Sequence, residues 1–375
     1  MRKLSLLVPC LFSFVSLELR AQPATPVVTP AVLSAADMNT LGVYVDSLSR
    51  MHLFSGVVLV AKRDSVMFQR AYGIARRELD IPNRLTTRFV GASIGKVLTA
   101  TAILQLVQDG KMALDDPIAK HAPELLRDSV GRLVQVRHLL SHTSGLENSL
   151  TLPMQEWHQL LPYLRSFSVQ ATPGKRYDYS DWGYVALGAL VEIASGEDYF
   201  DFVKRRILVP AGMVASDAIR RGGEPLPANA AVGYRSVTDS AGLRFLTAWH
   251  EVRGADVPYG IGYTSATDLH RLLSALLDGR LLSPPLVREM IGPRRELSAD
   301  RYGLGIMHFL DGRMFGHSGG DDVLPMDAWM LQYAGTDYRL VVLSNLRPDN
   351  QNAGSRVLRK MLELIDAART RGARQ

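Results

Sequence analysis

The chain has 375 residues, of which 47% are hydrophobic and 21% charged, and its formal net charge is +6 at pH 7. This length allows one large domain or two intertwined ones. The basic residues are spread along the sequence, with one modest run at Arg369, Arg371 and Arg374, so we expect a solvated surface and no nucleic-acid partner. The only cysteine is Cys10, which excludes a disulfide, and its loss with the leader would exclude a cysteine nucleophile or a thiolate metal site.

Residues 1–21 have the pattern of a secretory signal peptide. Two basic residues precede an apolar run from Leu4 to Leu17, which ends near Ala21. The run is too short for a comfortable membrane span, and no later run of 18 apolar residues follows, so no stable span is expected after cleavage. An uncleaved anchor is the alternative. Residues 22–33, rich in proline and threonine, predict a spacer, and the protein is expected to be exported, either periplasmic or secreted.

The next segments predict a helix, two strands and a second helix. Ser34 and Asp37 form the pattern of a capping box, for a helix that ends near Arg50. Residues 56–73 indicate two strands joined by a turn. Residues 93–110 predict a helix that is apolar on nearly all sides, which is typical of a helix buried in the middle of a protein.

The remainder of the chain changes character near residue 295. Residues 115–290 are helix-rich and are punctuated by proline and glycine, and after residue 295 four short alternating or β-branched segments predict strands before a final helix. Strands at both ends with helices between them predict an α+β fold, with an antiparallel sheet built from both chain ends and flanked by helices. Residues 34–96 and 295–375 would form the sheet domain, residues 97–294 a large helical insertion, and a catalytic cleft would lie between them.

The segment "FVGASIGKVLTATAILQLVQDG" at residues 89–110 has three interpretations. A phosphate-binding loop fails, because its motif needs four residues before the Gly-Lys pair and Ser or Thr after it. A nucleophile elbow, G-x-S-x-G, would need the alternating parallel strands and helices that residues 115–290 lack. The third interpretation is S-x-x-K, Ser93 and Lys96, whose side chains lie on one face of a helix.

The S-x-x-K interpretation needs a mechanism that activates the serine. A serine hydroxyl is a poor nucleophile until a base takes its proton. A neutral Lys96 can be that base if its pKa falls well below the usual ~10.4, and burial beside an apolar helix lowers the pKa of a lysine.

Two later motifs give the segment its context. Tyr179 stands two positions before Asp181 in "YSD", and "HSG" at residues 317–319 lies on a predicted strand. The order Ser-x-x-Lys, Tyr-x-Asn and Lys/His-Ser/Thr-Gly resembles the serine β-lactamase-like family, which includes class C β-lactamases, D-Ala-D-Ala carboxypeptidases, D-aminopeptidases and esterases. "VRHLLSHTSGL", "YGIGYTSATDL" and "LVVLSN" match as well, and the resemblance runs from about Leu53 to Asn345.

The resemblance implies a role for each matching residue. Ser93 would be the nucleophile that forms an acyl-enzyme, Lys96 its proton partner, and Tyr179 would shuttle the proton to the leaving group. The resemblance implies a reaction that needs no metal and no cofactor. It also implies that the substrate is a small molecule or a peptide. The residues that would line the oxyanion hole and the substrate wall are Ser93, His317, Ser318, Gly319 and Gly320, with the oxyanion held by the backbone N–H groups of Ser93 and Gly320.

Asp181 is a departure, because the family pattern has Asn at this position. A carboxylate close to Lys96 would raise the pKa of the lysine, the opposite of what a lysine base needs. Either Asp181 points away, or it is protonated, or Lys96 is a fixed charge while Tyr179 carries the proton. His317 in place of a lysine, followed by Asp321 and Asp322, further indicates a site that disfavours carboxylate substrates and prefers esters, amides or amine-bearing peptides.

The sequence therefore predicts an exported serine hydrolase. Its substrate is an ester, an amide or a peptide, with β-lactams and D-amino-acid peptides as members of that range, and the oligomeric state is open. The alternative is a catalytically silent relative, a binding or cell-wall-associated protein that keeps the fold. His138 and His142, four residues apart, have the spacing of a zinc pair, but no Glu follows His138, so a structural role is favoured.

Overall fold

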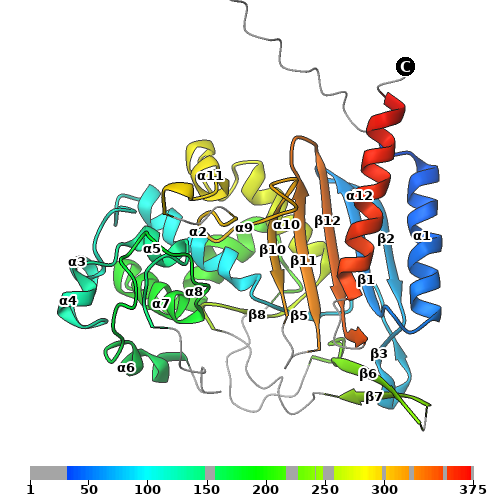
Figure 1. Cartoon of the computed structure of the whole chain (residues 1–375), viewed down its shortest axis with the longest axis horizontal. Coiled ribbons are helices and arrows are strands. Elements are labelled where there is room, and N and C mark those ends of the chain that lie inside the picture. The colour runs from blue at the N-terminus through cyan, green and yellow to red at the C-terminus, as the bar shows by residue number, and fades with distance from the viewer. Residues whose placement is uncertain are drawn as a thin grey trace, which may run out of the picture.

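An antiparallel sheet of six strands forms the centre of the computed structural model, which describes residues 32–147, 157–216, 227–240, 242–247, 257–297, 301–320, 325–348 and 353–372 (Figure 1). The strands are β1 (Gly56–Lys62), β2 (Ser65–Tyr72), β9 (Met307–Phe309), β10 (Met314–Gly319), β11 (Asp327–Tyr333) and β12 (Tyr338–Ser344). Their order is β2-β1-β12-β11-β10-β9. The prediction of an antiparallel sheet from both chain ends is confirmed. The predicted signal peptide and residues 22–31 of the predicted spacer lie outside the described residues, as do Asp321 and Asp322.

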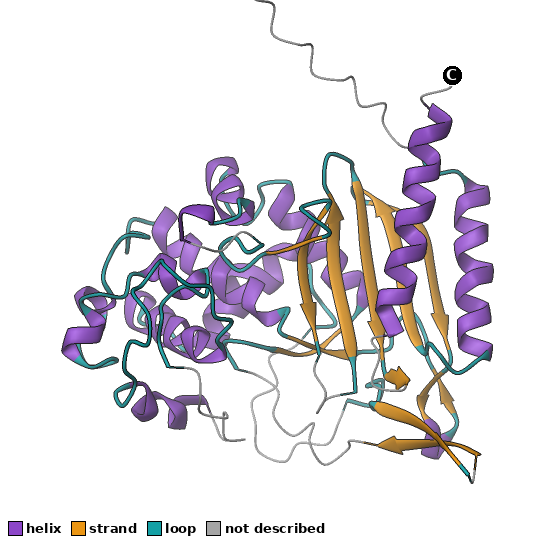
Figure 2. Cartoon of the chain, viewed as in Figure 1, coloured by secondary structure: helices purple, strands orange, loops and turns teal. Residues whose placement is uncertain are grey.

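The adjacent strands β1 and β12 are buried on both faces, because helices cover each side of the sheet (Figure 2). Side chains alternate between the faces of a strand. Val58 and Val60 of β1 therefore pack toward α1 (Ala35–Arg50) and α12 (Ala353–Gly372), while Val57 and Leu59 pack toward the helix-rich part of the chain. The predicted capping box at the start of α1 is confirmed, with Ser34 and Asp37 bonded reciprocally.

The remaining helices lie mainly on the other side of the sheet (Figure 1). They are α2 (Gly95–Gln108), α3 (Ile118–His121), α4 (Asp128–Gly131), α5 (Val136–Leu140), α6 (Leu161–Leu164), α7 (Asp181–Ser195), α8 (Tyr199–Val203), α9 (Val209–Ala211), α10 (Ala266–Leu277) and α11 (Pro284–Ile291). The predicted burial of α2 is confirmed, since every residue from Gly95 to Leu106 is buried. None of the helices in the described ranges combines the length and the hydropathy that crossing a bilayer requires.

The helix-rich middle of the chain also contains strands that the sequence pattern did not reveal. β6 (Tyr234–Asp239) and β7 (Gly242–Thr247) form a hairpin beside β13 (Leu346–Pro348), and β8 (Ile261–Thr264) pairs with β5 (Phe89–Ala92). β3 (Ile74–Arg76) and β4 (Ile81–Pro82) form a separate short pair. The helix α10 packs against β1, β11 and β12. Residues 97–294 are therefore not purely helical, and part of this segment belongs to the layer that covers the sheet.

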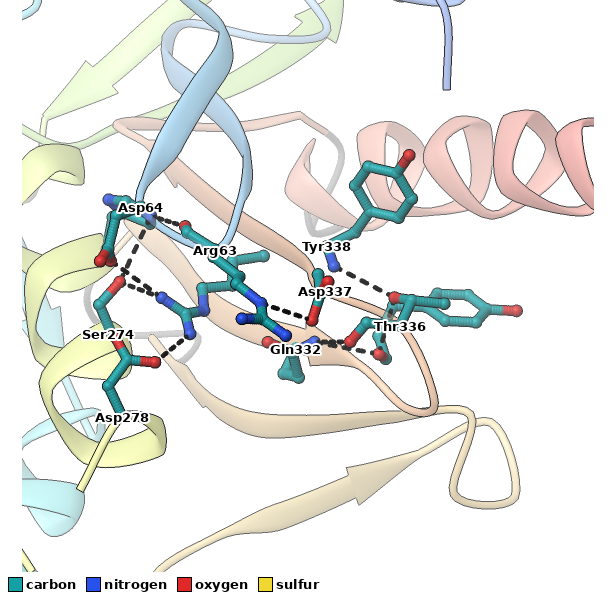
Figure 3. A network of polar contacts seen from close by, with 11 residues as sticks. Arg63, Asp64, Ser274, Asp278, Gln332, Thr336, Asp337 and Tyr338 are labelled. Atoms are coloured by element: carbon teal, nitrogen blue, oxygen red, sulfur yellow. Dashed lines mark hydrogen bonds and ion pairs between the residues drawn. The ribbon is translucent and has the colours of Figure 1, made fainter. Parts of the chain in front are cut away.

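A buried arginine joins α10 to the sheet. The guanidinium of Arg339, on β12, lies 3.2 Å from Asp64 and 2.9 Å from Asp278, and it also donates to the Ser274 hydroxyl. Figure 3 shows Asp64, Ser274 and Asp278 converging in this network, with the exposed pair of Arg63 and Asp337 beside it. The arginine side chain is only 4% exposed, whereas that of Asp64 is 69% exposed. The network therefore fixes the β1–β2 turn and the end of α10 to the centre of the sheet.

We expect Arg339→Leu to lower the free energy of unfolding by about 2 kcal/mol, because it removes hydrogen bonds between charged groups. The loss is no larger because water can still reach the carboxylates of Asp64 and Asp278 that the arginine leaves behind. Urea denaturation measures this. Arg63→Leu is the matched control: its ion pair with Asp337 is exposed, so its effect should stay below about 1 kcal/mol. Equal effects of the two substitutions would contradict the structural role of Arg339.

Candidate active site

Ser93 lies in the turn between β5 and α2. The strand ends at Ala92, which pairs with Ile261 of β8 and has a φ of 45°, a left-handed conformation that costs a non-glycine residue roughly 1 kcal/mol. Gly95 begins the helix, and a Cβ at that position would overlap the backbone of Gly260 and Ile261. A glycine is therefore required for α2 to start this close to β8, and the half-buried Ser93 is held at that junction.

Lys96 points from the first turn of α2 toward Ser93. Its side chain is completely buried, and its Nζ atom lies 3.2 Å from the Ser93 hydroxyl oxygen and 3.1 Å from the Tyr259 carbonyl oxygen. The same nitrogen lies 2.5 Å from a carboxylate oxygen of Asp181. The ammonium thus has three oxygen partners from three different elements of the fold.

The charge state of Lys96 follows from two opposing effects. Burial lowers the pKa of the ammonium, but the nearby Tyr179 phenol and then the Asp181 carboxylate raise it, and the net result is a pKa above the ordinary value. Burial alone would favour a neutral lysine, but it does not act alone at this site, and the raised pKa agrees with the alternative in which Lys96 is a fixed charge. Lys96 remains an ammonium across the neutral pH range.

Tyr179 completes the group that the motifs predicted. Its ring centroid lies 4.7 Å from the Lys96 nitrogen, and its phenol hydrogen-bonds to the same ammonium. The side chain is half-buried, as is that of Ser93. The structure therefore brings the side chains of Ser93 and Tyr179 together around the buried positive charge of Lys96.

Asp181 does not point away from the site. It is the first residue of α7, directly after the N-cap Ser180, where the helix dipole favours a negative charge. Its Oδ1 faces Lys96 and is buried, while the side chain as a whole is 36% exposed. The exposed surface therefore belongs chiefly to the rest of the carboxylate, including Oδ2. Asn at this position would present a donor as well as an acceptor, whereas the carboxylate presents acceptors only.

The third motif lies at the end of β10, against the nucleophile turn. A Cβ at Gly319 would overlap the carbonyl oxygen of Gly91 and lie 3.0 Å from the backbone nitrogen of Ser93. Gly320 follows directly and is exposed. The close approach of the two backbones places Ser93 and Gly320 near one another, as a two-donor oxyanion hole requires.

The prediction that His317 lines the substrate wall needs correction. Its side chain is completely buried. Nδ1 lies 2.6 Å from the Ser318 carbonyl oxygen, to which it donates, so Nε2 accepts from the Tyr302 hydroxyl at 3.0 Å. Burial, followed by the charge of Lys96, lowers the pKa of His317 to about 3. The imidazole of His317 is therefore neutral and buried below the surface that would face a substrate, so it supplies no positive charge to that substrate.

The structure also places residues that the sequence analysis did not assign to the site. The Tyr259 carbonyl contacts Lys96, and the Tyr302 hydroxyl contacts His317. The sequence analysis matched the segment "YGIGYTSATDL", which begins at Tyr259, only as a signature of the family. Trp157 and Trp182 are buried in the core. Trp329 packs beside the cluster under α1 and α12, on the opposite face of the sheet.

Solved structures identify the class of fold. A penicillin-binding protein from Bacillus halodurans superposes with a TM-score of 0.71 and 27% identity, covering 85% of this chain and 98% of that one. The D-amino acid amidase from Ochrobactrum anthropi SV3 gives a TM-score of 0.72 with 24% identity, covering 88% and 99% of the two chains. The fold is of the β-lactamase/transpeptidase type.

Sequence comparison then gives the family. The pattern of the Beta-lactamase family matches residues 44–363. Esterase EstB from Burkholderia gladioli is 31% identical over 268 residues, which are 62% of this chain and 68% of the esterase. PbpX from Bacillus subtilis is 30% identical over 258 residues, 67% of this chain, and the matched part spans 61% of PbpX. The chain belongs to the Beta-lactamase family, which includes serine hydrolases.

Proposed function

We propose that this protein is an exported serine hydrolase that acts through an acyl-enzyme on Ser93. The observation that carries the proposal is the buried ammonium of Lys96, which touches the Ser93 hydroxyl and hydrogen-bonds to Tyr179. A completely buried charge is costly unless it has hydrogen-bonding partners, and one of the partners of this charge is the hydroxyl of the half-buried Ser93. The resemblance to an esterase and to penicillin-binding proteins supports the same reaction class.

Acylation follows from these contacts. The Ser93 oxygen attacks the acyl carbon of the substrate, and its proton passes to the Tyr179 oxygen as the Tyr179 hydroxyl gives its own proton to the leaving group. The bond from the acyl carbon to the leaving group breaks, and the adjacent Lys96 ammonium stabilises the negative charge that develops on the Tyr179 oxygen during the transfer. The N–H groups of Ser93 and Gly320 stabilise the oxyanion of the intermediate. Lys96 keeps its proton throughout, in accordance with its raised pKa.

Deacylation uses the same groups in reverse. A water molecule takes the place of the leaving group and attacks the acyl carbon as it passes a proton to the Tyr179 oxygen, and the bond to Ser93 breaks as the Ser93 oxygen takes the proton of the Tyr179 hydroxyl. Lys96 again supplies a fixed positive charge.

The charges around the site favour a substrate without a carboxylate. His317 is neutral, and Asp181 presents a partly exposed anion where the family pattern has an amide. We propose that the substrates are esters, amides or amine-bearing peptides, because a donor group can pair with Asp181 and a carboxylate would be repelled. D-amino-acid amides, and peptides with a free amino terminus and no carboxylate near the scissile bond, fit this description better than penicillins and cephalosporins, which carry a carboxylate beside the lactam ring.

Labelling of Ser93 tests the proposal. Intact-protein mass spectrometry should show one adduct after treatment with a fluorophosphonate, and Ser93→Ala should show none. An unfolded sample of the original chain serves as the control for non-specific reaction. A folded protein that forms no adduct and hydrolyses no member of a broad ester panel would instead be a silent binding protein. Acylation by penicillin without release would indicate a penicillin-binding role.

Asp181→Asn tests the charge state of Lys96. Loss of the carboxylate lowers the pKa of the ammonium, and since the reaction needs the protonated form, activity should be lost at a lower pH than in the original enzyme. The pH profile of kcat/KM between pH 6 and 10.5, corrected for spontaneous hydrolysis, should show an alkaline decline in Asp181→Asn that the original enzyme lacks. Asp178→Asn is the matched control, because that carboxylate pairs with Arg176. A rise in activity near pH 7 in Asp181→Asn would show that neutral Lys96 is the base.

A further inference from the structure

The loop that carries Tyr179 rests on residues 142–145. Its backbone N–H groups donate along that segment, from Gln170 to the Gly145 carbonyl at 2.7 Å, from Gly174 to the Thr143 carbonyl at 2.8 Å, and from Asp178 to the His142 carbonyl at 2.8 Å. These bonds give the loop a fixed register before it enters α7. His142 stands at the end of the segment that is nearest the reacting groups.

We propose that His142 is the positioning residue for Tyr179, a role that rests on the hydrolase function proposed above. It holds the tyrosine from both sides: its carbonyl accepts from Asp178, and its Nδ1 accepts from the Ser180 N–H at 3.0 Å. Between these two bonds its ring lies against the Tyr179 ring, with the centroids 4.3 Å apart and the planes 33° apart. Every residue from 178 to 180 therefore has a contact with His142.

The imidazole is neutral and has a defined tautomer. Because Nδ1 accepts a main-chain N–H, the ring proton is on Nε2. Burial, followed by the positive charge of Lys96, lowers the pKa of His142 well below the usual value. A neutral ring can pack against Tyr179 without adding a second positive charge beside the lysine.

The backbone conformation and the burial of His142 both reduce the stability of the folded protein. His142 has a φ of 57°, in the left-handed region, and only 2% of its surface is exposed. Its Nε2 is buried and has no hydrogen-bond partner among the described residues. Strained backbone and an unsatisfied polar atom each oppose folding, so the hydrogen bond from Ser180 and the packing of the ring must offset both. The packing against Tyr179 and Tyr302, whose centroid lies 4.7 Å away, fixes its place.

His142→Asn is the most informative substitution. Asn tolerates the left-handed conformation, and its side-chain oxygen can replace Nδ1 as the acceptor for Ser180, but it removes the ring from Tyr179. His138→Asn is the matched control. His138 is also buried, and its Nδ1 also accepts a backbone N–H, from Gln135 at 3.1 Å, but no contact joins its ring to Tyr179 among the described residues.

The readout is the dependence on the leaving group. We would measure kcat/KM for a p-nitrophenyl ester and an ethyl ester of the same acyl group. A displaced Tyr179 delivers the proton poorly, and the basic ethoxide needs that proton more than p-nitrophenolate does. His142→Asn should lower kcat/KM by about 10-fold for the p-nitrophenyl ester and about 100-fold for the ethyl ester. His138→Asn should keep the ratio of the two esters unchanged.

The outcomes separate the two proposals. An original enzyme that hydrolyses neither ester and leaves Ser93 unlabelled would overturn the hydrolase function and this role with it. An active enzyme in which His142→Asn lowers both esters equally, or neither, would overturn the role of His142 alone. If His142→Asn does not fold, His142→Gly also suits the left-handed backbone and also removes the ring from Tyr179, and the same change in the ester ratio is required of it.

Discussion

Replacing Lys96 with methionine is expected to lower kcat/KM for an ester substrate by about 1,000-fold or more. The substitution keeps most of the side-chain volume and removes the charge that stabilises Tyr179 and touches Ser93. Losses of a positioned charge or a proton-transfer partner are typically in the range of about 100- to 10,000-fold. Steady-state kinetics on the purified variant, together with the rate of fluorophosphonate labelling at Ser93, measure the effect.

The stability of Lys96→Met should change far less than its activity. Removing one partner of a buried ion pair destabilises a protein by leaving the other charge unpaired, but the Asp181 side chain is 36% exposed, so water can solvate part of that charge and limit the loss. Lys120→Met is the matched control, because that lysine is exposed and paired with Asp116 at 2.6 Å, and it should leave kcat/KM unchanged. A Lys96→Met enzyme within ten-fold of the original would show that the buried ammonium is not part of the reaction.

A single methyl group at Gly319 is expected to cost about 100-fold in kcat/KM. The added Cβ would overlap the Gly91 carbonyl and crowd the Ser93 nitrogen, so the end of β10 must move away from the nucleophile turn. A displacement of about 1 Å at a reacting group is enough for a loss of this size. Kinetics on Gly319→Ala with the ester panel measure it, and the thermal midpoint reports how much of the effect is due to folding.

The chain offers a control for that substitution as well. Gly183, in α7, is also buried, but a Cβ there would meet its neighbours at 3.7 Å or more. Gly183→Ala adds the same methyl group and should retain full activity, with equal or higher stability, because alanine favours a helix more than glycine does. If Gly319→Ala were as active as Gly183→Ala, the close approach of β10 to Ser93 would have no importance for catalysis.

The sequence predicted the site best where a motif is local. Ser93 and Lys96 are three residues apart, and the turn that the Lys96 N–H closes onto the Ser93 carbonyl at 3.0 Å brings their side chains together just before and within the first turn of α2. The meeting of Tyr179 with them came only from the family resemblance, since 83 residues of sequence separate it from Lys96 and no local pattern relates the two.

The charges of the site could not be predicted from the sequence. The pKa of Lys96 depends on a burial effect and an ion-pair effect of opposite sign, and their balance depends on the distance to Asp181, which only the fold sets. The place of His317 in its motif likewise predicts a residue that lines the substrate site. In the structure its ring is buried and hydrogen-bonds to Tyr302 instead. The strands β6, β7 and β8 were missed because each is short and lies within a segment whose dominant pattern is helical.

The pairing of β1 with β12 has a consequence for how the protein acquires its structure. Gly56 pairs with Ser344, so the central strands of the sheet cannot join until nearly the whole polypeptide has been synthesised. Contacts between such distant residues require a large loop to close first, and chains rich in them fold slowly. A nascent chain would expose the apolar surface of β1 during that interval, and it would need protection from aggregation until its last strands arrive.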